Sequence, residues 1–288
     1  MDGIIIINKP QNSTSHDIVK KAKKILNEKV GHTGTLDPMA TGVLPLLIGK
    51  GTLCSKYLIN HDKIYEVELQ LGIKTDTADS EGNIIERKEV TNLSFELVRE
   101  ILKEFLGKQQ QMPPMYSAIK INGKKLYEYA RQGKKVNIEP RNIEIYNIEL
   151  KTINTETKTI FFNVHCSKGT YIRSLCEDIA EKLNTVGYMK KLKRIQVGDF
   201  NINNSITIDD LELNINDKSF VNNHFISVEE LFTKCDRIDL NERKLELFLN
   251  GVMLTQKYKD GIYKIYNNEN FIGIGIINNE LLKRDIII

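Results

Sequence analysis

GHTGTLDPMATG, at residues 31–42, is the stretch of this sequence on which the interpretation of the fold depends. Its three glycines allow a backbone to come close to a ligand, and it places His32 and Asp37 in one short segment. An Asp before a Pro in a loop is most often an ordinary turn residue. Long ordered loops, however, often carry function, so in this context Asp37 is the first candidate for a catalytic carboxylate.

The surrounding segment, residues 30–51, contains further glycines and two prolines. Because both residue types interrupt regular structure, we expect a structured loop with short apolar pieces and no long helix. The segment ends in Gly49-Lys50-Gly51-Thr52, which looks like the end of a phosphate-binding loop. That loop needs G-x-x-x-x-G-K followed directly by Ser or Thr. Here Gly42 lies too far back and Gly51 follows the lysine, so a nucleotide-hydrolase function is poorly supported.

Outward from this segment, the hydrophobic pattern predicts a mixture of strands and helices. Residues 3–7 form a predicted buried strand that ends at Lys9-Pro10, and the loop at 12–15 leads into a helix that ends near Leu26. Residues 65–71 alternate apolar and polar side chains, which is typical of a half-buried strand. The other expected elements are a polar, acidic loop at 75–83, a helix capped by Ser94 and closed by Gly107, strands at 116–121, 143–145 and 159–164, and helices at 126–130 and 171–183.

This order of elements is a mixed α+β pattern and not a regular alternation of strand and helix. After about Asp236 the sequence changes to short apolar stretches separated by Asn and Gly turns. Since 288 residues are long for one compact domain, we predict a large catalytic domain at 1–235 and a small β-rich domain at 236–288.

Composition excludes several classes of protein. Hydrophobic residues make up 41% of the chain and charged residues 27%, which is ordinary for a globular protein that needs no disulfide or structural metal. No apolar run reaches the roughly 20 residues that span a bilayer, and residues 3–7 are too short for a signal peptide. We therefore expect a cytoplasmic protein without membrane contact. The four cysteines show neither a C-x-x-C pair nor zinc spacing, so reduced and mostly buried thiols are expected.

The formal net charge of +3 does not by itself predict nucleic-acid binding. Basic residues nevertheless gather in four clusters, each of which could contact phosphates. Taken singly, each cluster is better explained as a solvated helix or turn face. The clusters are Lys20-Lys21 with Lys23-Lys24, Lys120 with Lys124-Lys125, Lys134-Lys135, and Lys190-Lys191 with Lys193-Arg194.

The stretch at 31–42 closely resembles the catalytic motif of the TruB family of tRNA pseudouridine synthases, and the resemblance continues along most of the chain. Several long motifs in the family's order are not expected by chance. They are Asn8-Lys9-Pro10 with Ser15, Lys63-Ile64-Tyr65, TDTADSEG at 75–82, PPMYSAIK at 113–120, YEYARQG at 127–133 and GTYIRSL at 169–175.

This resemblance implies roles for six residues. Asp37 matches the family's essential aspartate, Tyr65 matches a tyrosine that stacks on the target base and is placed for proton transfer, and Arg173 matches an arginine that pairs with the aspartate. His32 matches a histidine that helps to hold the RNA with the base flipped out. The two residues that match positions lining the uridine pocket are Tyr171 and Leu192.

The resemblance also implies a pseudouridine synthase fold with a mixed, largely antiparallel central sheet, and a C-terminal PUA-like RNA-binding domain. The implied substrate is the uridine at position 55 in the T loop, so the implied partner is the T arm of tRNA. The reaction breaks a C–N glycosidic bond and rejoins the uracil through carbon. Because no redox change or group donor is involved, no cofactor and no metal are expected. Nothing in the sequence demands more than a monomer.

Other interpretations remain open from the residues alone. Tyr65 on an alternating strand could be ordinary packing, His32 a loop hydrogen-bonder and Arg173 part of a structural salt bridge. The protein could act chiefly as a tRNA-folding chaperone in which Asp37 is incidental, or modify another RNA with the same fold. The sequence also does not choose whether the carboxylate attacks the sugar, attacks the base or helps to remove a sugar proton.

Two positions depart from the family pattern. The family usually has glycine where Asn12 stands, and because Asn is the next best residue for a left-handed backbone, we expect the turn to survive. A lysine is common where Leu53 stands. One RNA contact is therefore either lost or supplied by Lys50 or Lys56.

Overall fold

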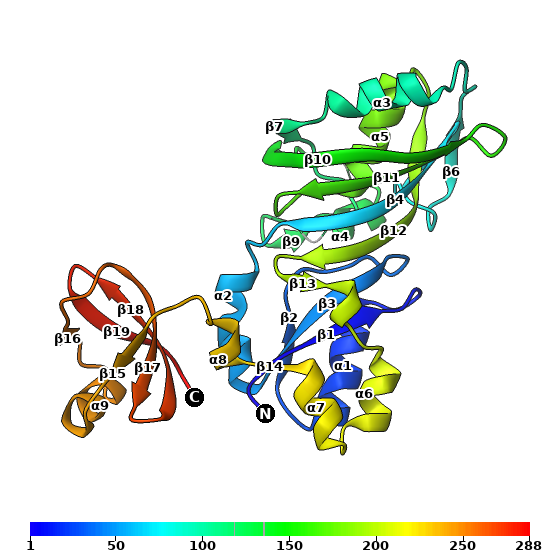
Figure 1. Cartoon of the computed structure of the whole chain (residues 1–288). Helices are drawn as coiled ribbons and strands as arrows, with labels where there is room; N and C mark the ends of the chain where they lie inside the picture. The colour runs from blue at the N-terminus through cyan, green and yellow to red at the C-terminus, as the bar shows by residue number, and fades with distance from the viewer. Residues whose placement is uncertain (118, 135) are drawn as a thin grey trace.

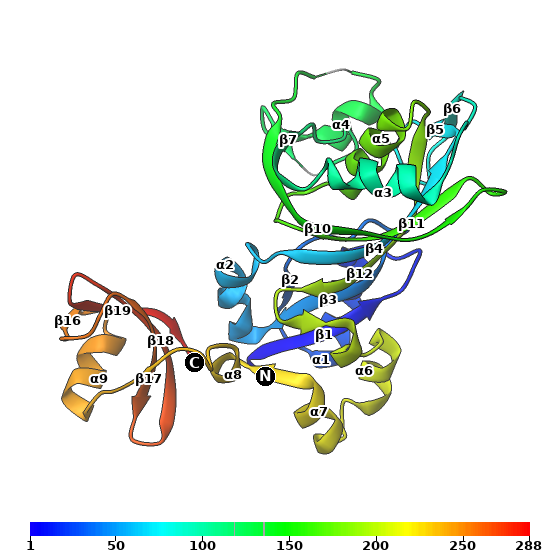
Figure 2. The same cartoon turned by 45° about the horizontal axis from the view of Figure 1, so that its top comes forward.

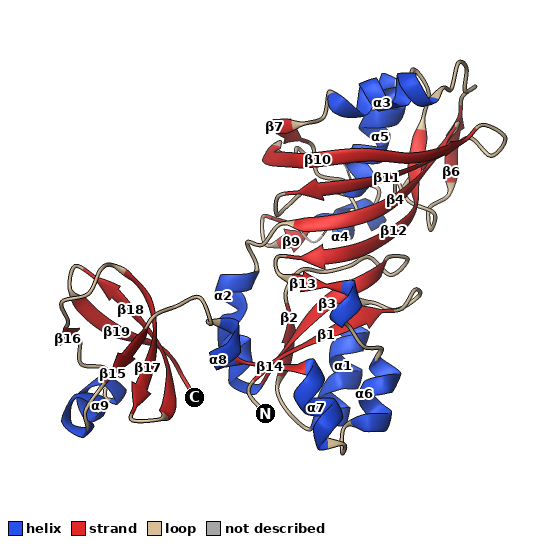
Figure 3. Cartoon of the chain, viewed as in Figure 1, coloured by secondary structure: helices blue, strands red, loops and turns tan. Residues whose placement is uncertain are grey.

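The computed structural model describes the chain from Met1 to Ile288 except residues 118 and 135. Most of the chain forms a ten-stranded sheet with helices packed against it, and the C-terminal part forms a separate five-stranded sheet (Figure 1). Strands and helices are interspersed along the large sheet and not regularly alternated (Figure 3). This arrangement confirms the predicted α+β class.

The large sheet is built from strands that lie far apart in the sequence. They are β1 (Gly3–Lys9), β2 (Val30–His32), β3 (Thr41–Ile48), β4 (Lys63–Leu71), β7 (Gly107–Gln111), β10 (Arg141–Asn154), β11 (Thr159–Cys166), β12 (Gly187–Val197), β13 (Phe200–Asn201) and β14 (Phe225–Ser227). Their order is β14-β1-β3-β12-β4-β11-β10-β7, with β2 beside β3 and β13 beside β12. Among the described strands of this sheet only β12 and β3 pair in parallel, so the sheet is mixed and largely antiparallel, as predicted.

Different helices cover the two halves of this sheet (Figure 2). Helices α1 (Ser15–Leu26) and α6 (Ile208–Asn214) pack on β1 and β3, and α3 (Phe95–Lys103) and α5 (Ile172–Lys182) pack on β4, β10, β11 and β12. Short helical segments complete this part of the chain: η1 (Gly49–Cys54), α2 (Ser55–Leu58), α4 (Leu126–Arg131), η2 (Ile202–Asn204), α7 (Lys218–His224) and α8 (Val228–Leu231). None of the helices in the described residues is long and apolar enough to cross a membrane.

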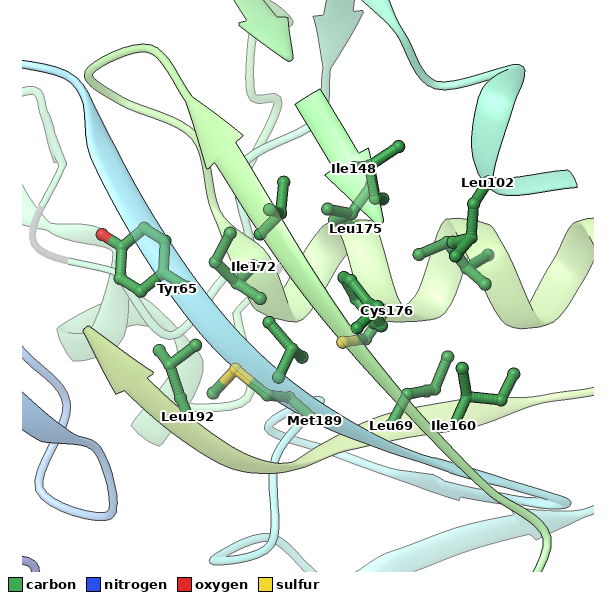
Figure 4. Packing of buried hydrophobic residues seen from close by; sticks show 14 of the residues in the cluster. Tyr65, Leu69, Leu102, Ile148, Ile160, Ile172, Leu175, Cys176, Met189 and Leu192 are labelled. Atoms are coloured by element: carbon green, nitrogen blue, oxygen red, sulfur yellow. The ribbon is translucent and has the colours of Figure 1, made fainter. Parts of the chain in front are cut away.

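One apolar cluster joins α5 to the middle of the sheet and ends at a polar side chain (Figure 4). Leu175 and Cys176 of α5 face Leu69 of β4 and Met189 of β12, and all four are almost completely buried. Tyr65 lies at one end of this cluster with its hydroxyl pointing away from the apolar side chains. The packing therefore fixes α5 against β12 and against β4, the strand that carries Tyr65.

Several predicted elements are confirmed by the structure. The first strand and helix lie where the pattern placed them, Thr14 forms a capping box with Asp17, and Ser94 caps α3. The alternating segment after Lys63 is β4, and the helix at 171–183 is α5. Helix α3 ends at Lys103, before Gly107, which instead begins β7 with a positive φ of 92°.

Three predictions about secondary structure were wrong. Residues 41–48, expected to lie within a loop, form the buried central strand β3, because hydrophobic burial outweighs the presence of Pro45. The strand expected at 116–121 contains only β8 (Lys120–Ile121), which pairs with β9 (Lys124–Lys125), and Ala118 lies outside the described residues. The basic cluster at 190–194, expected on a solvated helix or turn, lies on the central strand β12.

The C-terminal sheet consists of β15 (Arg237–Asp239), β16 (Leu254–Thr255), β17 (Gly261–Asn267), β18 (Asn270–Asn278) and β19 (Leu281–Ile287), with α9 (Glu242–Leu249) packed against it. This confirms the expected β-rich character, whereas the division at residues 235 and 236 stays a prediction. The sheet contacts the rest of the chain through Asp285, which accepts hydrogen bonds from Lys56 and, at 2.5 Å, from the Tyr57 hydroxyl. An apolar cluster that includes Cys54, Phe232 and Ile286 adds to this contact.

The four cysteines are free thiols, as predicted. Cys54, Cys166 and Cys176 are buried, and burial raises the pKa of the Cys54 and Cys166 thiols to about 12. They therefore stay protonated and unreactive at neutral pH. A separate hairpin is formed by β5 (Ile73–Thr75) and β6 (Ile84–Arg87).

Phe162→Ala is expected to lower the free energy of unfolding by about 3–5 kcal/mol, because it opens a cavity in the cluster beneath α5. Phe162 is 1% exposed, whereas its neighbour Phe161 points to the other face of β11 and is 36% exposed. Phe161→Ala is therefore the matched control, with an expected loss of about 1 kcal/mol or less. Urea unfolding followed by circular dichroism measures both. Equal losses for the two variants would contradict the described facing of β11.

Candidate active site

The loop that carries Asp37 connects β2 to β3 and is held by the N-terminal segment of the chain. The Ser15 hydroxyl accepts a hydrogen bond from the Leu36 amide at 2.9 Å and donates to the Leu36 carbonyl at 3.2 Å. The Asn12 amide donates to the Pro38 carbonyl at 2.9 Å. Asn12 has a φ of 63°, which confirms that asparagine maintains the left-handed turn expected there.

Lys9 adds a further link between these two segments. Its ammonium group donates to the carbonyls of Ser13 at 2.6 Å, Pro10 at 2.9 Å and Pro38 at 3.3 Å, and the residue is completely buried. Burial lowers the pKa of Lys9 to about 8, while the nearby Asp37 carboxylate opposes this shift. Lys9 therefore acts as a clamp on the backbone on either side of the loop.

Asp37 is joined to Arg173 by a two-pronged ion pair. The distance is 3.1 Å from Arg173 Nε to Asp37 Oδ2 and 3.4 Å from Nη2 to Oδ1. Arg173 lies in the first turn of α5 and is only 7% exposed, whereas 34% of the Asp37 side chain stays exposed. The fork geometry orients the carboxylate as well as pairing its charge.

A second carboxylate stands behind Arg173. Asp79 Oδ2 lies 3.5 Å from Arg173 Nη1, and Asp79 itself accepts hydrogen bonds from the Thr77 hydroxyl at 2.5 Å and the Glu81 amide at 3.1 Å. Arg173 also donates to the Tyr116 carbonyl at 2.8 Å. The sequence analysis missed Asp79, although it lies in the quoted motif at 75–82, because its loop was interpreted only as polar and acidic.

The electrostatic environment of Asp37 combines opposing effects. Burial raises the pKa of the Asp37 carboxyl above its ordinary value, the Arg173 guanidinium opposes this rise, and the negative charge of Asp79 adds to it. A raised pKa means that the site stabilises the ionised carboxylate less than water does. Arg173 is therefore the main group that keeps Asp37 ionised.

A cavity of about 480 Å³ opens in front of this ion pair. It is lined by five of the six residues that the sequence analysis selected: Asp37, Tyr65, Tyr171, Arg173 and Leu192. Tyr65 of β4 and Leu192 of β12 lie on neighbouring strands that form one wall (Figure 4). Burial raises the pKa of Tyr65 to about 12, so its hydroxyl is protonated at neutral pH. A pocket of this volume is within the usual range for small-molecule and nucleoside ligands.

Tyr171 is positioned by a residue that the sequence analysis did not select. The Gln111 side chain accepts a hydrogen bond from the Tyr171 amide at 2.8 Å and donates to the Tyr171 carbonyl at 3.0 Å. Gln111 is the last residue of β7 and is buried. The end of the sheet therefore fixes the backbone immediately before α5, and with it the direction of Arg173.

His32 is the one selected residue that the structure does not place in the lining of this cavity. It lies at the end of β2, five residues before Asp37, and its Nδ1 atom is buried without a hydrogen bond in the described part of the chain. Burial lowers the pKa of His32, so the imidazole is neutral at pH 7.

The basic clusters do not all have the solvated character expected of them. Lys190 and Lys191 both pair with the buried Glu68, at 2.7 and 3.1 Å. Arg194 is 1% exposed and donates to the carbonyls of Val43 at 2.8 Å and Gly34 at 2.9 Å. The interpretation of Arg194 as part of a solvated face was wrong, because β12 lies in the middle of the sheet. Lys135, in another predicted cluster, lies outside the described residues.

Leu53, where the family commonly has a lysine, is exposed in η1. Lys56, one of two candidates to replace a lysine there, is engaged by Asp285 of the C-terminal sheet. Lys50 is exposed and forms no ion pair with the described residues. Gly51 of the same segment packs against Gly3, where an added Cβ would lie 2.3 Å from the Gly3 carbonyl oxygen, so the glycines here have a packing role.

Comparison with known proteins gives consistent results. Residues 22–172 match the model for the TruB family pseudouridylate synthase N-terminal domain, and residues 173–233 match the model for the tRNA pseudouridylate synthase B C-terminal domain. A protein of Clostridium kluyveri named tRNA pseudouridine synthase B is 43% identical over 284 residues, which cover 96% of each chain. A protein of the same name from Caldanaerobacter subterraneus is 40% identical over 287 residues, or 98% of each chain.

The fold is also similar to that of solved structures. A chain in the structure of an H/ACA RNP bound to a substrate RNA containing 2′-deoxyuridine superposes with a TM-score of 0.72 and 22% identity, over 99% of this chain and 85% of the other. A Cbf5-Nop10-Gar1 complex contains a chain with a TM-score of 0.70 and 24% identity, over 99% and 83% of the two chains. At these identities the likeness establishes the fold, and confirms the pseudouridine synthase fold predicted from the sequence.

Replacing Arg173 is expected to raise the pKa of Asp37, because the guanidinium is the main group that lowers it. In Arg173→Met the ¹³Cγ resonance of Asp37 should titrate at higher pH than in the wild type, whereas Arg173→Lys keeps a positive charge and should shift the midpoint less. The Asp37→Asn spectrum identifies the resonance. A midpoint that is equal or lower in Arg173→Met would contradict this account.

The same shift makes a prediction about stability. Because the folded-state pKa of Asp37 is raised, the stabilisation by its protonated form is fully present below the unfolded-state pKa and is lost as pH rises through the folded-state pKa. At pH 7 the ionised Asp37 therefore carries a free-energy cost in the folded state. Asp37→Asn removes this cost and leaves Arg173 paired with Asp79. Its melting temperature at pH 7 should therefore equal or exceed that of the wild type, and a clear decrease by calorimetry would be inconsistent with the cited shift.

Proposed function

The chain belongs to the TruB family of pseudouridylate synthases, as an enzyme that isomerises uridine to pseudouridine in tRNA, and on this premise we propose that its target is uridine 55 of the T loop. One observation supports the assignment most directly. The carboxylate of Asp37 and the guanidinium of Arg173 meet in a cavity whose wall carries the Tyr65 ring. These three groups come from segments far apart in the sequence, and they are the three to which the family resemblance assigns catalytic roles.

In this proposal Asp37 is the essential catalytic carboxylate. The isomerisation breaks the bond between C1′ and N1, turns the uracil, and forms a bond between C1′ and C5. The proton on C5 is lost and N1 gains one, so atoms and electrons balance without a donor or oxidant. An ionised carboxylate beside the sugar serves each open route, whether it attacks the sugar, attacks the base or removes a sugar proton. Arg173 keeps the carboxylate ionised and oriented.

The other selected residues hold the nucleoside. A base stacked in RNA cannot reach the cavity, so it must flip out at a cost of about a few kcal/mol. Stacking on the Tyr65 ring returns about 1–3 kcal/mol, and the hydroxyl of the same side chain is proposed to take part in proton transfer. Tyr171 and Leu192 form further walls of the cavity. His32, on β2 outside the lining, helps to hold the RNA with the base extruded.

We further propose that the enzyme acts on the T arm as a monomer in the cytoplasm. The C-terminal sheet is proposed to be a PUA-like RNA-binding domain, consistent with its β-rich architecture. A chaperone in which Asp37 is incidental would not need a carboxylate fixed by Arg173 and facing a cavity, so the enzymatic function is favoured.

Asp37→Asn is expected to abolish pseudouridine formation while changing the Kd for tRNA by no more than a few-fold, because the amide keeps the shape of the carboxylate and loses its charge. Tritium release from tRNA labelled at uracil C5 measures turnover, and filter binding measures the Kd. Asp209→Asn, on the exposed end of α6, is the control and should retain activity. Appreciable turnover by Asp37→Asn would refute the catalytic assignment, and turnover at another uridine would refute the proposed position.

The two contributions of Tyr65 can be separated by substitution. Tyr65→Phe keeps the stacking ring and loses the hydroxyl, so it should bind T-loop RNA as the parent does but turn over much more slowly. Tyr65→Leu should also lose the stacking energy of about 1–3 kcal/mol, which corresponds to a roughly 5- to 150-fold higher Kd. Binding is measured in the Asp37→Asn background so that the RNA is not converted. Equal Kd values for the Phe and Leu variants would argue against stacking.

A further inference from the structure

The cavity has two walls with different charge balance. On one wall Arg173 is paired with both Asp37 and Asp79. The other wall carries three more cations: Lys63, Lys168 and Arg194. In the part of the chain that the structure describes, none of these three lies within 4.0 Å of a carboxylate. This wall is therefore positively charged without an internal counter-ion.

The three cations are held by neutral groups. Arg194 uses Nε and Nη2 to donate to the carbonyls of Val43 and Gly34. The Lys63 ammonium donates to the His61 carbonyl, and the Lys168 ammonium donates to the Asn60 side chain at 2.6 Å. Lys63 is 9% exposed and Arg194 1%. Burying a charge without a partner is unfavourable, so the arrangement calls for an anion that the protein does not supply.

The nearby acidic group is already engaged. Asp62, next to Lys63 in sequence, is hydrogen-bonded to the imidazole of His165. Burial lowers the pKa of Lys63, and the positive charges of Arg194 and Lys168 lower it further, while the negative charge of Asp62 opposes the shift. Lys63 is thus close enough to Arg194 and to Lys168 to be repelled by both. An anion placed among them would relieve this repulsion as well as the cost of burial.

The catalytic loop passes between two of these cations. Gly34 has a φ of 84°, and a Cβ added there would lie 3.4 Å from Arg194 Nη1 and 4.0 Å from Lys63 Cε. Gly34 precedes Asp37 by three residues and lines the same cavity. The absence of a side chain at this position leaves the space next to both cations open to a ligand that also reaches Asp37.

We propose that Lys63, Lys168 and Arg194 form a subsite for a backbone phosphodiester adjacent to the flipped uridine. The inference rests on the proposed function, because a nucleotide whose sugar lies at Asp37 brings a phosphodiester on each side of that sugar. Lys and Arg are the usual phosphate-binding residues, and phosphate contacts fix position without reading sequence. Gripping the phosphate beside the target nucleotide sets the sugar against the carboxylate and so supplies orientation for the reaction.

The salt dependence of RNA binding tests the subsite. The logarithm of the Kd for a T-stem-loop RNA is measured against the logarithm of the salt concentration in the Asp37→Asn background. Lys63→Met and Lys168→Met should each reduce the slope by about 0.7–0.9, the value for one phosphate contact, whereas Lys63→Arg should retain it. Lys182→Met is the matched control, since Lys182 pairs with Glu104 at the other end of α5, about 14 Å along the helix axis from Arg173.

A chemical cycle identifies the phosphate. The RNA carries one uncharged methylphosphonate linkage, on the 5′ or the 3′ side of the target uridine. The nucleotide on the 5′ side of this linkage has a 2′-O-methyl group, so that no 2′-hydroxyl can cleave the linkage. The reference RNA has the same 2′-O-methyl group and an ordinary phosphodiester. At one of the two positions, neutralising the linkage and Lys63→Met should each weaken binding by about tenfold. Both changes together should be no worse than either alone.

The outcomes separate this proposal from the proposed function. One outcome is that the wild type converts T-loop RNA while, at both linkages, the loss of affinity from the neutral linkage multiplies with the loss from Lys63→Met and with that from Lys168→Met. In that case the subsite is wrong and the function stands. A purely structural role for Lys63 would lower the melting temperature and leave the salt slope unchanged, which also overturns it. Should Lys63→Met not fold, the exposed Lys168 gives the same test through its own slope and cycle. Absence of conversion by the wild type would instead refute the function.

Discussion

The ion pair between Asp37 and Arg173 is the contact on which the rest of the pocket depends. It joins residues 136 positions apart, one in a loop after β2 and the other in the first turn of α5. The pair can form only because β3, which follows the loop, lies beside β12, against which α5 packs. The pairing of β12 with β3, which is the one parallel pairing among the described strands of the large sheet, therefore brings the two charged groups together.

Asp79 gives this pair a property that two groups alone would not have. When Asp37 changes its charge or its bonding during a reaction, Arg173 would lose its partner in a site where it is only 7% exposed. The second carboxylate keeps the guanidinium paired, and the Tyr116 and Thr77 carbonyls hold its direction. The same charge raises the pKa of Asp37. The site thus gains a fixed guanidinium at the expense of a less stable carboxylate.

The sequence predicted the parts of this structure that depend on local pattern or on motif. The alternation in β4, the capping of α1 and α3 and five of the residues that line the cavity were found in this way. It did not predict β3, because Pro45 and the surrounding glycines look like loop signals and only the pairing with β1 and β12 favours a strand. Arg194 was misread for a related reason. A run of basic residues looks solvated until its strand is known to be central. His32 was selected from the motif, and the motif could not show which way its ring lies relative to the cavity.

The contrast between the two walls explains why the cavity is built from groups that are individually unfavourable. A guanidinium, an ammonium and a carboxylate each lose hydration when they are buried, and well-packed apolar residues would make a more stable wall. On one wall Arg173 is paired with two carboxylates, so each of these buried charges has a partner in the absence of substrate. The wall around Gly34 holds Lys63 and Arg194 with backbone carbonyls, which position the cations and leave their net charge unbalanced. A site whose charge is completed only by its ligand gains more from binding than one already neutral, because the ligand removes a penalty that the empty protein carries.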